Sequence, residues 1–200
     1  MNSDTKVTNA PISDAVRHAM AVSLRGADEL LPQADWQAGE QIDGLLAQLK
    51  LQRPGVAAVY HPAGAELDPT CAAERLADLG WKTALPACLA PDEPMVFRLH
   101  APGAPLTPDA AGILSPPPAA RAVTPDLIIA PILAFDDAGR RLGQGGGYYD
   151  RTLSALRAAG APPPVVGLAY SAQEVERVPA DNHDQRLDAI LTETGYRVFA

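Results

Sequence analysis

Short, continuous runs of apolar residues most constrain the fold of this chain. They lie at residues 56–60, 126–130 and 165–169, and segments with helical spacing separate them. Runs of this length suit strands rather than helices. A strand that helices cover on both faces has a continuous apolar run, whereas a strand with one solvent-exposed face has alternating apolar and polar residues. The sequence therefore predicts the α/β class, with three layers and a largely parallel central sheet.

The remaining elements follow from the same periodicity. Residues 101–124 form the one long segment without clear hydrophobic periodicity. We interpret it as an irregular crossover in preference to a lid. Further short strands are predicted at 83–85, 95–99 and 189–192. Helices are predicted at 12–31, 36–49, 71–79 and 148–159.

Size and composition favour one domain. The chain has 200 residues, of which 47% are hydrophobic, and this is enough for one buried core but short for two. We expect a single domain over residues 1–200, with a disordered segment at 1–10. A monomer is the favoured state.

Charge and cysteine content exclude several classes of protein. A formal net charge of -8 argues against a general binder of nucleic acid or anionic membrane, because such affinity comes from clustered lysine and arginine. No run approaches the ~18 apolar residues of a spanning helix, and the N-terminus lacks the apolar core of a secretory signal. Cys71 and Cys88 have no closely spaced partners, which fits neither a zinc cluster nor a disulfide framework. These features predict a cytoplasmic protein in which an anionic ligand needs a local arginine pocket.

A glycine-rich turn is the strongest functional motif. Glycine occupies four of the five positions in 143–147, between an arginine pair and the helix predicted at 148–159. Glycines let successive backbone amides point toward one centre, and the start of a helix adds partial positive charge. The turn also follows the strand predicted at 126–130, and ligands of open α/β sheets collect outside the carboxyl ends of strands. The pattern indicates a phosphate-binding loop.

The turn is not one of the common phosphate loops. A P-loop requires lysine and then serine or threonine after its last glycine, whereas Tyr148 and Tyr149 stand there. A dinucleotide-binding fingerprint would need glycine in place of Tyr148. The glycines alone leave open a plain surface loop.

Four further residues have both a functional and a structural interpretation. Asp150 either complements the dipole of the following helix or holds Mg²⁺ against a phosphate. Asp184 is either part of an Asx turn or a second Mg²⁺ ligand. Glu66, which follows the strand predicted at 56–60, either accepts hydrogen bonds from N–H groups of a ligand or faces water. Arg17 points either toward a ligand or into solvent from the helix predicted at 12–31.

Together these residues resemble the 5-formyltetrahydrofolate cyclo-ligase family, also called methenyltetrahydrofolate synthetases. The strongest part is the segment 131–151, which ends in Gly-Tyr-Tyr-Asp-Arg. Supporting pieces elsewhere in the chain are Tyr60-His61-Pro62, Glu66, Leu85-Pro86, Met95, Phe97, the segment 166–169, Gln173, Pro179, His183-Asp184, Leu187-Asp188 and Thr192-Glu193.

The resemblance implies an ATP- and Mg²⁺-dependent ring closure. Its substrate would be 5-formyltetrahydrofolate and its products 5,10-methenyltetrahydrofolate, ADP and phosphate, with ATP and a reduced folate as the small-molecule partners. Phosphoryl transfer asks mainly for positioning, cations and backbone amides, which suits the residues above. The implied fold is the three-layer α/β/α arrangement that the family shares with sugar-phosphate isomerases and CoA-transferases.

The resemblance also implies roles for individual residues. Arg141, Tyr148 and Tyr149 would be catalytic, although a core-packing role for one tyrosine stays open. Glu66 and Tyr148 would bind the folate, and Asp150 and Asp184 would hold Mg²⁺. The implied ATP-binding set is Arg17, Arg141, Leu142, Gly143, Gln144, Gly145, Gly146, Gly147, Tyr148 and Tyr149.

One position departs from the family pattern. The family usually has lysine four residues before the arginine that Arg17 matches, and this chain has Ser13. Serine supplies no charge, so we expect weaker ATP binding. Two alternatives remain: a relative that binds folate or nucleotide without catalysis, and an ATP-dependent enzyme of the same fold that acts on another substrate.

Overall fold

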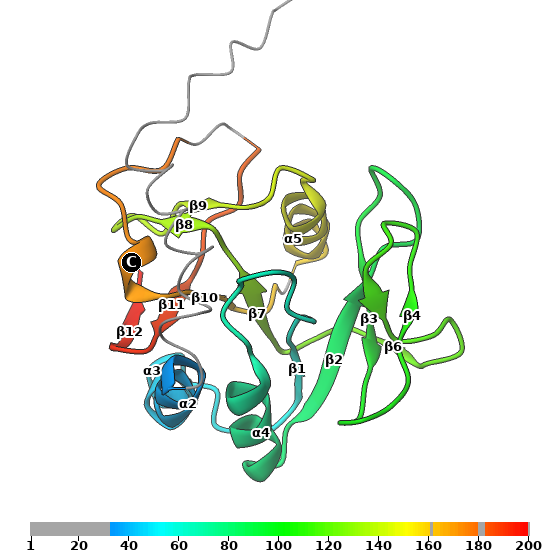
Figure 1. Ribbon diagram of the computed structural model, residues 1–200, viewed down its shortest axis with the longest axis horizontal. Helices are drawn as coiled ribbons and strands as arrows, with labels where there is room; N and C mark the ends of the chain where they lie inside the picture. Colours follow the sequence, from blue (N-terminus) through cyan, green and yellow to red (C-terminus); the bar gives the residue numbers. More distant parts are fainter. Residues whose placement is uncertain (1–32, 161, 180–182, 200) are drawn as a thin grey trace, which may run out of the picture.

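A computed structural model of the chain describes residues 33–160, 162–179 and 183–199. In this part a large sheet lies between helices on its two faces (Figure 1). The predicted helix at 12–31, with Ser13 and Arg17, and the expected disorder at 1–10 lie outside the described residues. No helix in the described part is long and apolar enough to cross a membrane.

The central sheet has eight strands in the order β12-β11-β10-β7-β1-β2-β3-β6. The strands from β11 to β2 pair in parallel, and β12, β3 and β6 add antiparallel edges. The prediction of a largely parallel sheet is confirmed. The bounds are β1 Val56–Ala58, β2 Lys82–Ala87, β3 Val96–Leu99, β6 Ala122–Val123, β7 Leu127–Pro131, β10 Val165–Leu168, β11 Ala189–Thr192 and β12 Gly195–Val198.

The central strand β7 is continuously apolar because both of its faces are buried. Leu127 and Ile129 pack on one face, in a core shared with α2 (Gln33–Glu40), α3 (Ile42–Gln48) and α4 (Thr70–Asp78). Ile128 packs on the opposite face with Leu153 of α5 (Tyr148–Ala158). All three β7 side chains are fully buried, and such burial contributes about 1.5–3 kcal/mol per large side chain. The three-layer prediction is therefore confirmed.

The helix predicted at 36–49 is wrong in one respect, because it is two helices separated by a turn at Gln41. Helix α2 packs against α4, where Gly39 approaches so closely that a Cβ would lie 3.2 Å from Cys71. Helix α3 packs against β12 and also contacts α4. The turn at Gln41 thus redirects the chain between the two helices.

The order of the strands reverses at β1. From β1 the chain passes to β2 on one side, and β7, β10 and β11 are added on the other side. Ligands of open α/β sheets bind in the crevice outside the carboxyl ends of strands at such a switch point. The ends of β1 and β7 therefore mark the expected site.

The segment 101–124 is not a purely irregular crossover. It contains a hairpin of β4 (Thr107–Pro108) and β5 (Leu114–Ser115), followed by β6. A second hairpin, of β8 (Ala134–Phe135) and β9 (Arg141–Leu142), leads into the glycine-rich turn. Strands of two residues have no measurable periodicity, so the pattern of apolar residues did not predict them.

Asp136 organises the hairpin between β8 and β9. The residue is fully buried, and its Oδ1 accepts hydrogen bonds from the backbone N–H groups of Ala138 and Arg140, each at 3.0 Å. Its Oδ2 accepts from the N–H of Val178 at 3.0 Å and from Nη1 of Arg140 at 3.2 Å. Burial alone would raise the pKa of Asp136, but these hydrogen bonds outweigh it and the pKa is lowered.

We expect Asp136→Ala to lower the free energy of unfolding by about 2–4 kcal/mol, because buried N–H groups lose their acceptor. A lowered pKa in the folded state means that the carboxylate stabilises the fold at neutral pH and loses this effect as the pH falls through that pKa. Urea denaturation across pH measures both effects. The exposed neighbour Asp137, changed to alanine, is the matched control. Equal stability of the two variants would contradict the role of Asp136.

Candidate active site

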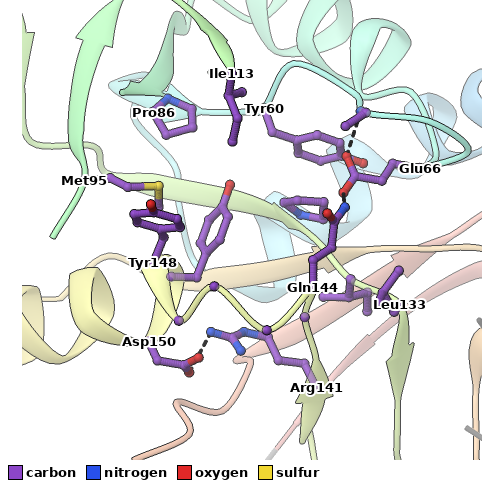
Figure 2. Close-up of a pocket in the computed structure, with 18 of the residues that line it drawn as sticks. Tyr60, Glu66, Pro86, Met95, Ile113, Leu133, Arg141, Gln144, Tyr148 and Asp150 are labelled. Atoms are coloured by element: carbon purple, nitrogen blue, oxygen red, sulfur yellow. Dashed lines mark hydrogen bonds and ion pairs between the residues drawn. The ribbon is translucent and has the colours of Figure 1, made fainter. Parts of the chain in front are cut away.

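A cavity of about 470 Å³ lies at the carboxyl ends of β1 and β7. Its lining includes Tyr60 after β1, the segment 131–133 at the end of β7, and the turn between β9 and α5 (Figure 2). Small-molecule sites commonly enclose about 300–1,000 Å³. The cavity therefore lies where the strand order predicts a ligand, and its size suits one.

The glycine-rich turn at 143–147 forms one wall of this cavity. Gly145 and Gly147 have φ of +88° and +66°, a region that residues with a Cβ adopt only at a cost. Gly147 is the N-cap of α5, so the first N–H groups of the helix follow the turn directly. Arg151 holds the turn from the helix, since its Nη2 donates to the carbonyl oxygen of Gly146 at 2.9 Å.

A partly buried ion pair stands beside the turn. Arg141 of β9 is 7% exposed, and its Nη2 donates to Oδ1 of Asp150 in the first turn of α5 at 2.8 Å. The backbone N–H of Gln185 donates to the same oxygen at 2.9 Å. A buried guanidinium is costly without a counter-charge. The predicted cation and the predicted acid are thus brought together as a pair.

Glu66 reaches the same cavity from the loop after β1. Its Oε2 accepts from the N–H of Ala63 at 2.9 Å, and its Oε1 accepts from Nε2 of Gln144 at 2.7 Å (Figure 2). Burial raises the pKa of Glu66, and the two hydrogen bonds oppose that rise. The carboxylate is therefore partly desolvated and tied to the glycine-rich turn.

Three tyrosines line the cavity and differ in their surroundings. Tyr148 stacks under the guanidinium of Arg151, 4.9 Å from the ring centre. Tyr149 packs partly buried on the core beside α5, and this burial, followed by the charge of Glu66, raises the pKa of its phenol. Tyr60, which belongs to the family motif but has no role predicted from the sequence, is 4% exposed and donates its hydroxyl to the carbonyl oxygen of Leu67.

The sequence did not predict the apolar wall of the cavity. Pro86 and Met95 belong to the family motif but have no role predicted from the sequence, and Ile113 and Leu114 come from the hairpin of β4 and β5. The one available signal was the apolar Ile113-Leu114 pair inside a segment rich in proline, alanine and glycine.

Asp184 also lines the cavity, next to His183 in the loop before β11. Arg157 of α5 holds this loop, because its Nη1 donates to Oε1 of Gln185 and its Nη2 donates to the carbonyl oxygen of Arg186 at 2.9 Å. Within the described residues no group of three or more His, Cys, Asp or Glu could hold a metal ion. Two carboxylates in one cavity fit a cation that nucleotide phosphates also ligate, since Mg²⁺ in such sites takes one or two carboxylates.

The cavity gathers every predicted site residue that the structure describes. These residues are Glu66, Arg141, Leu142, Gly143, Gln144, Gly145, Gly146, Gly147, Tyr148, Tyr149, Asp150 and Asp184.

Comparison with known proteins decides the family. A model of the 5-formyltetrahydrofolate cyclo-ligase family matches residues 14–193, a span that includes the whole cavity lining. The chain belongs to the 5-formyltetrahydrofolate cyclo-ligase family. The resemblance found in the sequence is thereby confirmed.

Individual cyclo-ligases agree with this assignment. The chain is 30% identical over 185 residues to the 5-formyltetrahydrofolate cyclo-ligase of Mycolicibacterium smegmatis, covering 88% of this chain and 91% of that relative. It is 39% identical over 101 residues to the cyclo-ligase of Haemophilus influenzae, covering 48% of this chain and 53% of the relative. In that second match the chain spans about half the length of the curated relative.

Among solved structures, the chain is similar to the NMR structure of Aquifex aeolicus 5,10-methenyltetrahydrofolate synthetase. The identity is 27% and the TM-score is 0.68, over 92% of this chain and 90% of that chain. The α/β fold is therefore that of a cyclo-ligase.

Proposed function

We propose that this cyclo-ligase converts 5-formyltetrahydrofolate to 5,10-methenyltetrahydrofolate and couples the ring closure to hydrolysis of ATP to ADP and phosphate. One observation carries the proposal: Glu66, a partly desolvated carboxylate, and the glycine-rich turn at a helix start line one cavity, and Nε2 of Gln144 in that turn donates to Oε1 of Glu66 at 2.7 Å. A reaction between a folate and ATP needs both ligands side by side, and proximity of this kind lowers the barrier substantially.

The chemistry proceeds in two steps. The formyl oxygen attacks the γ-phosphorus of ATP, and the bond from that phosphorus to the bridging oxygen of ADP breaks. The N10 amine then attacks the formyl carbon, which releases phosphate with the former formyl oxygen and leaves N5 and N10 joined through one carbon. The N10 proton is lost to water or to the departing phosphate. No protein nucleophile is required.

The residues of the cavity supply position and charge. The amides of the turn at 143–147 and the start of α5 bind the phosphates, and Arg141 neutralises charge on the transferred group. A phenol is protonated at neutral pH, and burial raises the pKa of Tyr149 further, so Tyr149 can serve as a hydrogen-bond donor to the substrates. Glu66 accepts hydrogen bonds from the N–H groups of the pterin.

Mg²⁺ fits this arrangement through Asp150 and Asp184, which both line the cavity. Arg141 and Gln185 both contact Oδ1 of Asp150, and the carboxylates of Asp150 and Asp184 would together hold the cation. When bound, the cation would neutralise phosphate charge. Asp150 in addition holds Arg141 in place, and Arg157 holds the loop of Asp184.

The partners follow from this chemistry. They are a reduced folate and ATP, with no nucleic acid or membrane, and we propose a monomer acting in the cytoplasm. Both cysteines, Cys71 and Cys88, are free thiols, which suits a reducing compartment.

The direct test is formation of the methenyl product, followed by its absorbance, with and without ATP and Mg²⁺. We expect one ADP for each methenyl group formed. Binding of folate without ADP formation would instead indicate a non-catalytic relative. ATP hydrolysis that 5-formyltetrahydrofolate does not stimulate would point to another substrate.

Glu66→Gln provides a sharper test of the folate site. A charged hydrogen bond is worth about 1.5–3 kcal/mol, so the KM for 5-formyltetrahydrofolate should rise about ten- to a hundredfold while the KM for ATP stays nearly constant. The ionised form accepts the pterin hydrogens, so wild-type affinity should fall as the pH drops through the raised pKa of Glu66. This pH dependence should be absent in the variant, and its persistence would assign it to another group.

A further inference from the structure

The wall of the cavity opposite the glycine-rich turn depends on the tip of the hairpin between β4 and β5. Ile113 and Leu114 line the cavity there and are 45% and 41% exposed. Figure 2 shows Ile113 facing the cavity beside Pro86 and Tyr60, on the side away from Arg141 and Asp150. When a ligand covers large apolar groups that are in contact with water inside a cavity, the burial favours binding of that ligand.

Asp109 fixes the position of this tip. Its Oδ1 accepts from the backbone N–H groups of Ala111 at 2.9 Å and Ile113 at 3.0 Å, which shapes the turn. Its Oδ2 accepts from the N–H of Cys88 at 2.8 Å, directly after β2, and the N–H of Ala110 donates back to the carbonyl oxygen of Cys88 at 3.2 Å. One carboxylate therefore both forms the turn and ties it to the central sheet.

Backbone hydrogen bonds from the N–H of Asp109 to the oxygen of Ile113 and from the N–H of Gly112 to the oxygen of Asp109 close the tip, but neither joins it to the central sheet. Strands β4 and β5 are two residues each and form a separate two-stranded sheet. A two-stranded hairpin is marginally stable on its own in water. The contact of β5 with β2 supports its base, whereas the tip is joined to the end of β2 through Asp109 and Ala110.

We propose that Asp109 is a positioning residue for the folate substrate, because it holds Ile113 and Leu114 as an apolar wall against which a ring of the folate packs. The inference rests on the proposed function and goes beyond it. Asp109 lines the cavity, and three backbone N–H groups donate to its carboxylate, as expected for a residue that holds the backbone in position.

Two variants of Asp109 distinguish the hydrogen bonds that shape the turn from the hydrogen bond that joins the turn to Cys88. Asp109→Ala removes all three hydrogen bonds, whereas the shorter hydroxyl of Asp109→Ser still caps the turn but does not reach Cys88. We expect both to raise the KM for 5-formyltetrahydrofolate about tenfold, with the KM for ATP within about twofold and kcat less affected. Ile113→Ala should raise the folate KM by a similar factor. Leu89→Ala is the control, because Leu89 is 50% exposed next to Cys88 but does not line the cavity.

Calorimetric titration with 5-formyltetrahydrofolate gives the same comparison without turnover, and thermal melting checks that each variant is folded. A wild-type folate KM in Asp109→Ser or Ile113→Ala would overturn the inference and leave the proposed function standing. Equal rises in the KM for ATP and for folate would also overturn it, because they indicate general loosening of the fold. If the wild-type protein neither binds nor converts the folate, the proposed function itself fails.

Discussion

The Asp150→Asn variant is expected to lose at least about a hundredfold in kcat while it stays folded, a loss typical of removing one preorganised electrostatic group from an active site. Asparagine keeps the shape and one acceptor oxygen but removes the charge that balances Arg141 and that we assign to Mg²⁺. Steady-state kinetics across Mg²⁺ concentration measure both roles, and the Mg²⁺ needed for half-maximal rate should rise.

Stability must be followed in the same variant, because Asp150 is the counter-charge of a buried group. The Arg141 side chain is 4% exposed and that of Asp150 is 23% exposed. Leaving a buried charge unpaired costs up to about 3–5 kcal/mol, and we expect less here because asparagine still accepts a hydrogen bond. The double variant Arg141→Met with Asp150→Asn removes the unpaired charge, so it should recover stability without recovering activity.

A matched control isolates the effect of charge alone. Asp137→Asn removes the same charge from an exposed position that does not line the cavity, so its kinetics should match the wild type. A purified Asp150→Asn protein with wild-type rate and unchanged Mg²⁺ dependence would exclude the metal role. Recovery of activity in the double variant would contradict the proposed roles of both Arg141 and Asp150 in the reaction.

The apolar runs predicted the centre of the sheet well because burial on both faces leaves a strong and local signal. The strands at β1, β7, β10 and β11 begin and end within about two residues of the predicted bounds, as expected for strongly patterned elements. The final strand β12 was missed. Its residues Gly195–Val198 are partly exposed at the sheet edge, so no continuous apolar run marks them.

The sequence predicted only those parts of the site that lie close together along the chain. The turn at 143–147 and Asp150 were found because their spacing along the chain carries the chemistry. The hydrogen bond from Gln144 to Glu66 joins residues 78 positions apart, and the tie from Asp109 to Cys88 joins residues 21 apart. Such contacts depend on which loops the sheet brings together, and no periodicity in the chain reports them.

The glycine-rich turn offers a series of alanine variants in which only the local geometry changes. Gly147 has φ +66°, and an added Cβ would lie 2.6 Å from Nη1 of Arg151. Gly145 has φ +88° but open space around an added Cβ. Gly143 has neither a positive φ nor a neighbour within 4 Å, so it is the control for the added methyl group itself.

We expect the loss of ATP affinity to increase from Gly143→Ala through Gly145→Ala to Gly147→Ala, measured by calorimetry on the purified variants. Left-handed backbone costs about 1–2 kcal/mol for a residue with a Cβ, so Gly145→Ala should weaken ATP binding roughly five- to thirtyfold. Gly147→Ala adds a close contact with Nη1 of Arg151, so the end of that side chain must also shift, and binding should fall further than in Gly145→Ala. Gly143→Ala should bind nearly as tightly as the wild type.

Equal losses of ATP affinity in all three variants would mean that phosphate approaches every glycine and that the methyl group, not the backbone conformation, blocks it. Unchanged affinity in all three would show that the turn does not bind the nucleotide.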